Sequence, residues 1–65
     1  MIDSEFMVKL GFIKKHDNIW VLYNEKLRVG WNETNGVLIL GYFQFPVSIY
    51  SKEDLTTILK ICKLF

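Results

Sequence analysis

The chain contains very few of the residues that usually cross-link a small protein. It is 65 residues long and has one cysteine and one histidine, the residue types that form disulfides and bind zinc. It also has one proline. Cys62 alone cannot form an internal disulfide, and Cys62 with His16 cannot supply the four ligands of a structural zinc site. A chain of this length buries only about 60% of its unfolded surface. Small domains usually gain further stability from disulfides, a structural metal or oligomerisation, and one cysteine with one histidine leaves oligomerisation as the available source.

Long hydrophobic runs and an excess of one charge are also missing. No stretch approaches the ~20 apolar residues that span a membrane, and the N-terminus has no signal-peptide core. Eight basic residues against seven acidic ones give a net charge of +1, whereas duplex nucleic-acid binders usually carry a strongly cationic face. We therefore expect no membrane span and no binding to duplex nucleic acid. A single unpaired cysteine favours a reducing, cytoplasmic location.

Capping signals predict a helix at each end of the chain. Asp3 or Ser4 can cap a short N-terminal helix, and Gly11 ends it. Ser51 and Asp54 form a shortened capping box before an amphipathic C-terminal helix. The apolar stripe of that helix has the spacing i, i+3, i+4, i+7 and consists of Leu55, Ile58, Leu59 and Cys62.

The residues between these helices carry strand and turn signals. The predicted strands are 12–15, 19–23, 27–33 and 37–43, and Pro46 makes 47–50 either an edge strand or an irregular connection. Asn35-Gly36 is typical of a type I′ hairpin, and Asn24-Glu25 predicts another two-residue turn. The whole chain, 1–65, is therefore predicted to be a single α+β domain with an antiparallel meander of three to five strands.

Two-residue turns would place the bulky apolar residues on one face of the sheet. Trp20 would then face Val29, and Trp31 would face Leu40. The full predicted set on this face is Trp20, Leu22, Leu27, Val29, Trp31, Leu38, Leu40 and Tyr42. Both turn assignments place the bulky apolar residues on this one face, so we expect the C-terminal helix to pack there.

The opposite face would carry a second apolar set that the helices cannot also cover. A contiguous exposed apolar surface usually marks an interface, so we predict a homodimer or higher homo-oligomer that hides this face. The predicted interface residues are Ile19, Val21, Val37, Ile39 and Phe43. Gly30 and Gly41 would lie opposite each other, which leaves a floor of bare backbone.

Arg28 is the only arginine and lies in the middle of a predicted strand on this second face. A guanidinium group suits carboxylate or phosphate recognition and stacks on rings. The sequence therefore predicts an anionic, ring-bearing ligand such as a nucleotide. The predicted ligand-binding residues are Arg28, Asn32, Tyr23, Phe43, Gly30 and Gly41. The alternative, a cation lying along an apolar strand with its head in water, stays open.

Catalytic motifs are absent from the sequence. His16 and Asp17 fall in a predicted turn, and Cys62 on an apolar stripe behaves as a small hydrophobe. Glu53 and Asp54 are accounted for by the helix dipole. We therefore expect a non-enzymatic protein without metal or cofactor. Two alternatives are a purely structural oligomerisation protein and a single-strand nucleic-acid binder that stacks bases on Tyr23, Tyr42, Phe43 and Phe45. The lysines Lys14, Lys15 and Lys26 make at most a small basic cluster, which is usually a solvated surface.

Several short motifs resemble those of small free-standing proteins from phages and mobile elements. The motifs are Leu10-Gly11-Phe12, Trp31-Asn32, Gly41-Tyr42-Phe43 and the Ser-capped, Leu-rich terminal helix. The resemblance concerns the general layout of the chain. It implies an accessory or anti-host protein that acts by binding, either as an inhibitor of a host protein or as a sponge that sequesters a nucleotide-like signalling ligand.

Overall fold

The computed structural model describes residues 1–25 and 27–65. The elements in chain order are α1 (Ser4–Leu10), β1 (Ile13–His16), β2 (Ile19–Tyr23), β3 (Arg28–Asn32), β4 (Leu38–Leu40), β5 (Phe43–Gln44) and α2 (Lys52–Ile61). The five strands form one antiparallel sheet in the order β1-β2-β3-β4-β5. The predicted α+β meander between two helices is confirmed.

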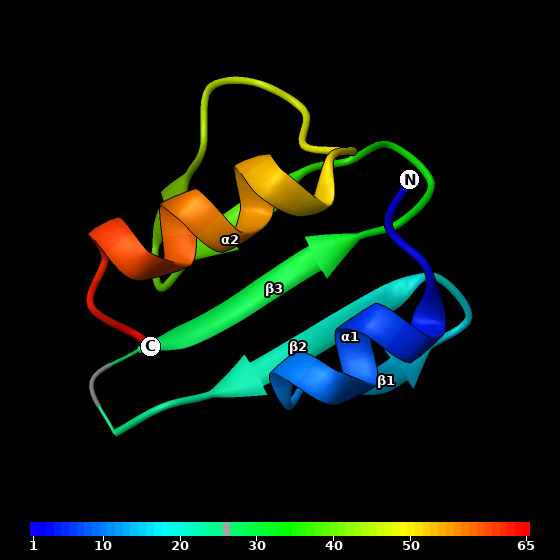
Figure 1. The fold of residues 1–65 in the computed structure, drawn as a ribbon, viewed down its shortest axis with the longest axis horizontal. Coiled ribbons are helices and arrows are strands. Elements are labelled where there is room, and N and C mark those ends of the chain that lie inside the picture. The colour runs from blue at the N-terminus through cyan, green and yellow to red at the C-terminus, as the bar shows by residue number, and fades with distance from the viewer. Residues whose placement is uncertain (26) are drawn as a thin grey trace.

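Both helices cover the same face of the sheet. Figure 1 shows α1 over the β1–β2 side and α2 over the β3–β4 side. Met7 of α1 and Leu55 and Leu59 of α2 belong to one buried hydrophobic cluster with the two tryptophans of the sheet. Neither helix in the described part of the chain has the length and hydrophobicity that crossing a lipid bilayer requires.

The predicted caps of both helices are confirmed. The Asp3 carboxylate accepts a hydrogen bond from the backbone N–H of Phe6 at 2.9 Å, and Gly11 ends α1 with a φ of 101°. The Ser51 hydroxyl accepts from the backbone N–H of Asp54 at 3.3 Å. These bonds satisfy N–H groups that a helix start leaves without partners.

The prediction that Cys62 faces the core is wrong, because α2 ends before that position. Lys63 has a φ of 58°, and the backbone N–H of Leu64 donates to the carbonyl of Leu59 at 3.0 Å. This is the hydrogen-bond pattern of a Schellman motif. It turns the chain so that Leu64 packs into the core and leaves Cys62 exposed.

The pairing of β2 with β3 differs from the predicted register by two residues. Trp20 pairs with Trp31 rather than with Val29. Asn24 and Leu27 exchange backbone hydrogen bonds of 3.0 and 3.1 Å, so the chain reverses one residue later than Asn24-Glu25 predicts. Each strand residue therefore meets a partner two positions away from the expected one.

The β3–β4 hairpin also differs from its prediction by two residues. The backbone N–H of Asn32 donates to the carbonyl of Val37 at 2.9 Å, which closes a four-residue loop. Gly36 has a φ of 72°, but Asn35 does not have the positive φ that a type I′ turn requires. The Asn32 side-chain oxygen accepts from the N–H groups of Thr34 and Asn35 at 2.8 and 3.2 Å, and this favours the longer loop.

Because side chains alternate with a period of two, both shifts leave most residues on their predicted faces. Tyr42 and Phe43 are the exceptions, since the predicted strand 37–43 is broken by a turn at Gly41-Tyr42. Phe43 pairs with Leu40 across this turn and so lies on the helix side of the sheet. Tyr42 is fully exposed instead of packing under the helix.

The segment 47–50 is an irregular connection rather than an edge strand. Ile49 is buried in the core, and its backbone N–H donates to the carbonyl of Gly36 at 2.7 Å. Its carbonyl accepts from the indole N–H of Trp31 at 2.9 Å. These two hydrogen bonds of Ile49 join the connection both to the β3–β4 loop and to the core.

Candidate binding face

The face of the sheet opposite the helices is the candidate site, and we call it the open face. In the observed register, the row Ile13, Val21, Gly30, Ile39 and Gln44 crosses all five strands. The neighbouring open-face residues are Ile19, Tyr23, Arg28, Asn32 and Val37. Both helices lie on the other side (Figure 1), so this face is partly open, as predicted.

The exposed side chain of Arg28 lies along the open face. Its Nη1 atom is 4.0 Å from the position that a Cβ atom on Gly30 would occupy. Gly30 therefore provides the flat backbone on which the guanidinium group rests. Val21, the strand partner of Gly30, is 0% exposed although no helix covers it. A predicted interface residue thus has no surface left to offer a partner.

A depression of about 330 Å³ lies beside the guanidinium group of Arg28. Such a volume falls at the lower end of the range of small-molecule sites, roughly 300–1,000 Å³. Its lining residues are Ile19, Arg28, Gly30, Trp31, Asn32, Asn35, Val37, Ile39 and Gln44. Three predicted ligand residues, Arg28, Gly30 and Asn32, are therefore brought together by the fold.

Gly41 lies on the other side of Arg28 from this depression. Its backbone N–H donates to the carbonyl of Arg28 at 2.7 Å, so the two residues are opposite each other. The predicted pairing of Gly41 with Gly30 is wrong, since Gly30 pairs with Ile39. A second depression of about 400 Å³ lies between Leu27, Arg28, Gly41 and Tyr42.

Phe43 is not on the open face, and the prediction that it belongs to that face is wrong. The reversal at Gly41-Tyr42 carries it to the helix side, where its ring meets Phe45 edge to face at 6.5 Å. The aromatic residues predicted to stack the bases of a single strand therefore lie on both sides of the sheet, since Tyr23 lies on the open face and Phe43 on the helix side. They do not form one continuous platform for a single strand.

Two cations flank Tyr23 at one end of the open face. The hydrogen bond from Arg28 and the nearby charge of Lys15 hold the pKa of the Tyr23 hydroxyl below its ordinary value. The Lys15 ammonium lies 5.7 Å from the centroid of the Tyr23 ring. Within residues 1–25 and 27–65, neither Arg28 nor Lys15 forms an ion pair with a carboxylate. This end of the face therefore attracts anions.

Lys15 is a site residue that the sequence reasoning left out of the predicted ligand-binding set, because the sequence groups it with Lys14. An irregularity in β1 between Lys14 and His16 shifts the register. Lys14 lies at the helix side, over the ring of Trp20 at 5.5 Å, whereas Lys15 lies over Tyr23. The alternation of side chains along a strand could have separated the two lysines. Lys26, the third predicted lysine, lies outside the described residues.

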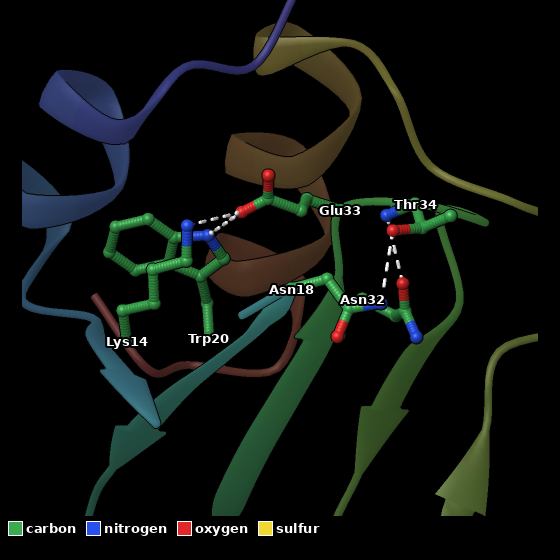
Figure 2. A network of polar contacts seen from close by, with 6 residues as sticks. All are labelled: Lys14, Asn18, Trp20, Asn32, Glu33 and Thr34. Atoms are coloured by element: carbon green, nitrogen blue, oxygen red, sulfur yellow. Dashed lines mark hydrogen bonds and ion pairs between the residues drawn. The ribbon is translucent and has the colours of Figure 1, made fainter. Parts of the chain in front are cut away.

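A polar network joins the loops at the other end of the sheet (Figure 2). The Glu33 carboxylate accepts from the indole N–H of Trp20 at 2.7 Å and lies 3.3 Å from the Lys14 ammonium. The Trp20 hydrogen bond is the main reason that the pKa of Glu33 lies below its ordinary value. Asn18 donates to the hydroxyl of Thr34 at 3.0 Å. These contacts hold two hairpin loops together, and Trp20 is committed to the core.

The reactive side chains named in the sequence analysis lie at the surface. His16 and Asp17 are exposed at the β1–β2 turn, and Cys62 is exposed at the end of α2. Among residues 1–25 and 27–65, no three His, Cys, Asp or Glu side chains gather in a way that could hold a metal ion.

Comparisons with known proteins give no match. No family model matches the chain, and neither a curated protein nor a solved structure does so. A functional proposal must therefore stand on the geometry and the charges of the open face.

Proposed function

We propose that the protein is a non-enzymatic binding module that holds an anionic, ring-bearing small molecule, such as a nucleotide, on its open face. The observation that carries the proposal is Arg28, which lies beside the depression over Gly30 without a carboxylate partner among the described residues. A guanidinium held against an apolar floor donates two parallel hydrogen bonds to a phosphate or carboxylate.

The surroundings of Arg28 give each part of such a ligand a place. The anionic group lies at the cationic end, where the Tyr23 hydroxyl and the Lys15 ammonium add to the guanidinium. The ring lies in the depression beside the guanidinium group and contacts its apolar side chains. Asn32 supplies an amide NH₂ group at the rim that can donate to a ring edge, since its side-chain oxygen already accepts from Thr34 and Asn35.

This binding activity fits a sponge that sequesters a nucleotide-like signal, one of the two roles that the resemblance to small phage and mobile-element proteins implies. A sponge needs affinity and abundance but no turnover. We place this role in the cytoplasm, where the exposed thiol of Cys62 stays reduced.

Isothermal titration calorimetry with nucleoside monophosphates, cyclic dinucleotides and a single-stranded oligonucleotide tests the proposal. We expect binding of at least one nucleotide, an affinity loss of about tenfold or more in Arg28→Ala, and partial recovery in Arg28→Lys, which keeps the charge but not the fork. Lys9→Ala is the matched control, since Lys9 pairs with Glu5 on the exposed surface of α1.

Two results would contradict the proposal. One is full nucleotide affinity in Arg28→Ala, and the other is the absence of binding by every nucleotide of the panel at about 1 mM, which corresponds to only ~4 kcal/mol. Preferential binding of the oligonucleotide would instead support the single-strand alternative.

A further inference from the structure

The solvent side of α2 is an exposed surface that the proposed ligand site does not use. Glu53, Thr57, Lys60 and Ile61 are all exposed, and their spacing places them on one side of the helix. Ile61 is 73% exposed, which makes it one of the most exposed large apolar residues described. This side of α2 therefore presents one apolar side chain beside charged ones.

A groove runs beside the first half of this helix. It has a volume of about 500 Å³ and is lined by Phe45, Val47, Ile49, Glu53, Asp54, Thr57 and Ile58. Its floor is apolar, whereas the carboxylates of Glu53 and Asp54 stand at its rim. Among the described residues neither carboxylate forms an ion pair. A fitting partner therefore presents an apolar side chain next to a cation.

The second half of α2 presents this combination. Ile61 is preceded by Lys60, and both side chains are exposed. If a second copy of the helix runs antiparallel about a twofold axis near Thr57, Lys60 of each copy comes opposite Glu53 of the other. Such an arrangement is self-complementary in charge, and it aligns the two helix dipoles favourably.

We propose that two copies of the chain form an antiparallel, twofold dimer through α2, in which Ile61 of each copy fills the groove of the other. This places the dimer interface on the helix side and leaves the open face free. The open face is a poor surface for self-association, because its charged residues Lys15 and Arg28 are both cations and no carboxylate lies among the open-face residues.

The dimer and the ligand site involve different surfaces, so one proposal can fail without the other. Sedimentation equilibrium over a concentration series compares the wild type with Ile61→Glu and Ile39→Glu. We expect a dimeric wild type, a dissociation constant at least about tenfold higher for Ile61→Glu, because the new carboxylate meets acidic rims, and no change for Ile39→Glu. Circular dichroism verifies that both variants fold, as both side chains are exposed.

A charge exchange tests the antiparallel geometry. Glu53→Lys and Lys60→Glu should each weaken the dimer, and the double variant should recover most of the loss, because the pair is restored with reversed signs. In a Cys62→Ser background, Thr57→Cys should cross-link two copies on oxidation, whereas Val8→Cys on the exposed side of α1 should not.

Three results would overturn the inference. The first is a wild type that stays monomeric at about 1 mM protein. The second is a dimer that Ile39→Glu dissociates and Ile61→Glu does not, which would return the interface to the open face. The third is a double charge variant no better than either single one. Nucleotide affinity measured in Ile61→Glu shows independently whether the ligand site is intact.

Discussion

The two faces of this sheet are built from alternating residues of the same strands, yet one face is buried and the other stays partly exposed. On one face Leu38 and Val29 are buried under both helices. On the other, Ile39 stays 37% exposed, and Arg28 folds over Gly30. Apolar character alone does not separate the faces, because both carry β-branched and aliphatic residues. The two faces differ in the size of their side chains, and the helices pack against the face that carries the large ones.

The tryptophans decide which face the helices cover. Trp20 and Trp31 pair across β2 and β3 and give the helix side its bulk. Each indole N–H also donates to a polar partner, Glu33 for Trp20 and the buried carbonyl of Ile49 for Trp31. The open face offers glycine and isoleucine at the corresponding rows, which leaves a shallow surface instead of a layer that a helix can interlock with. A shallow apolar surface with two cations at one end suits a small ligand better than a helix.

Adjacent residues of β4 provide the sharpest test of this difference. Leu38→Ala should destabilise the protein by about 2–5 kcal/mol, because a fully buried side chain is removed from the core. Such a loss is comparable to the whole stability of a small domain. Ile39→Ala, one residue further on, should cost less than about 1 kcal/mol. Urea unfolding followed by tryptophan fluorescence measures both, and similar losses for the two variants would abolish the distinction between the faces.

Two glycines extend the comparison to the backbone. Gly41 has a φ of 67°, and a Cβ atom there would lie 2.6 Å from Cδ1 of Leu27. Gly41→Ala should therefore cost about 1–2 kcal/mol for the left-handed conformation alone. Gly30 has an ordinary φ, and the nearest atom to its Cβ position is Nη1 of Arg28 at 4.0 Å. Gly30→Ala should thus be neutral or slightly stabilising, by up to about 1 kcal/mol.

Thermal unfolding of the two glycine variants measures these effects, and ligand titration adds a second readout. The new methyl group at Gly30 would raise the floor of the depression without affecting the fold. Weaker nucleotide binding with unchanged stability would place the ligand over Gly30. An unstable Gly30→Ala variant would show instead that the open face is packed more tightly than its exposure indicates.

The sequence predicted the elements and the faces better than the partners. Period-two alternation assigned Val29, Trp31 and Leu38 to one side, and a shift of two residues in each hairpin preserved that assignment. The loop at Asn35-Gly36 was predicted wrongly because its length depends on distant groups. Ile49 bonds to Gly36, and the Tyr50 ring lies within 2.9 Å of the Gly36 Cβ position. The preference of the Asn-Gly dipeptide for a two-residue turn takes no account of these contacts with distant residues.

The candidate site was predictable where it depends on alternation and not where it depends on turns. Arg28, Gly30 and Asn32 share a face in any register, because they alternate along one strand. Phe43 was misplaced because the reversal at Gly41-Tyr42 was not anticipated. Cys62 was misplaced for a similar reason, since a helical stripe predicts burial only as far as the helix continues. Chain reversals therefore limited the prediction of both fold and site.

The smallest effect is expected at the polar end of the helix-covered face, where Glu33 meets Trp20 and Lys14. The pKa of Glu33 is lower in the folded protein than in the unfolded chain, chiefly because of the Trp20 hydrogen bond. A lowered pKa contributes stability above the unfolded value, about 4.3, and that contribution is lost as the pH falls through the folded value. Because the side chain is partly exposed, we expect less than about 1 kcal/mol.

Glu33→Gln should therefore be less stable than the wild type at neutral pH, and the difference should vanish in acid, where the wild-type carboxylate is protonated as well. The glutamine oxygen can still accept from Trp20 but cannot attract the Lys14 ammonium, which lies 3.3 Å from the wild-type carboxylate. Urea unfolding at neutral and acidic pH measures the difference. Glu5→Gln is the control, since Glu5 and Lys9 form an exposed pair at 4.0 Å, worth at most about 0.5 kcal/mol. A Glu33→Gln deficit that persists unchanged in acid would show that the loops are held by shape and not by charge.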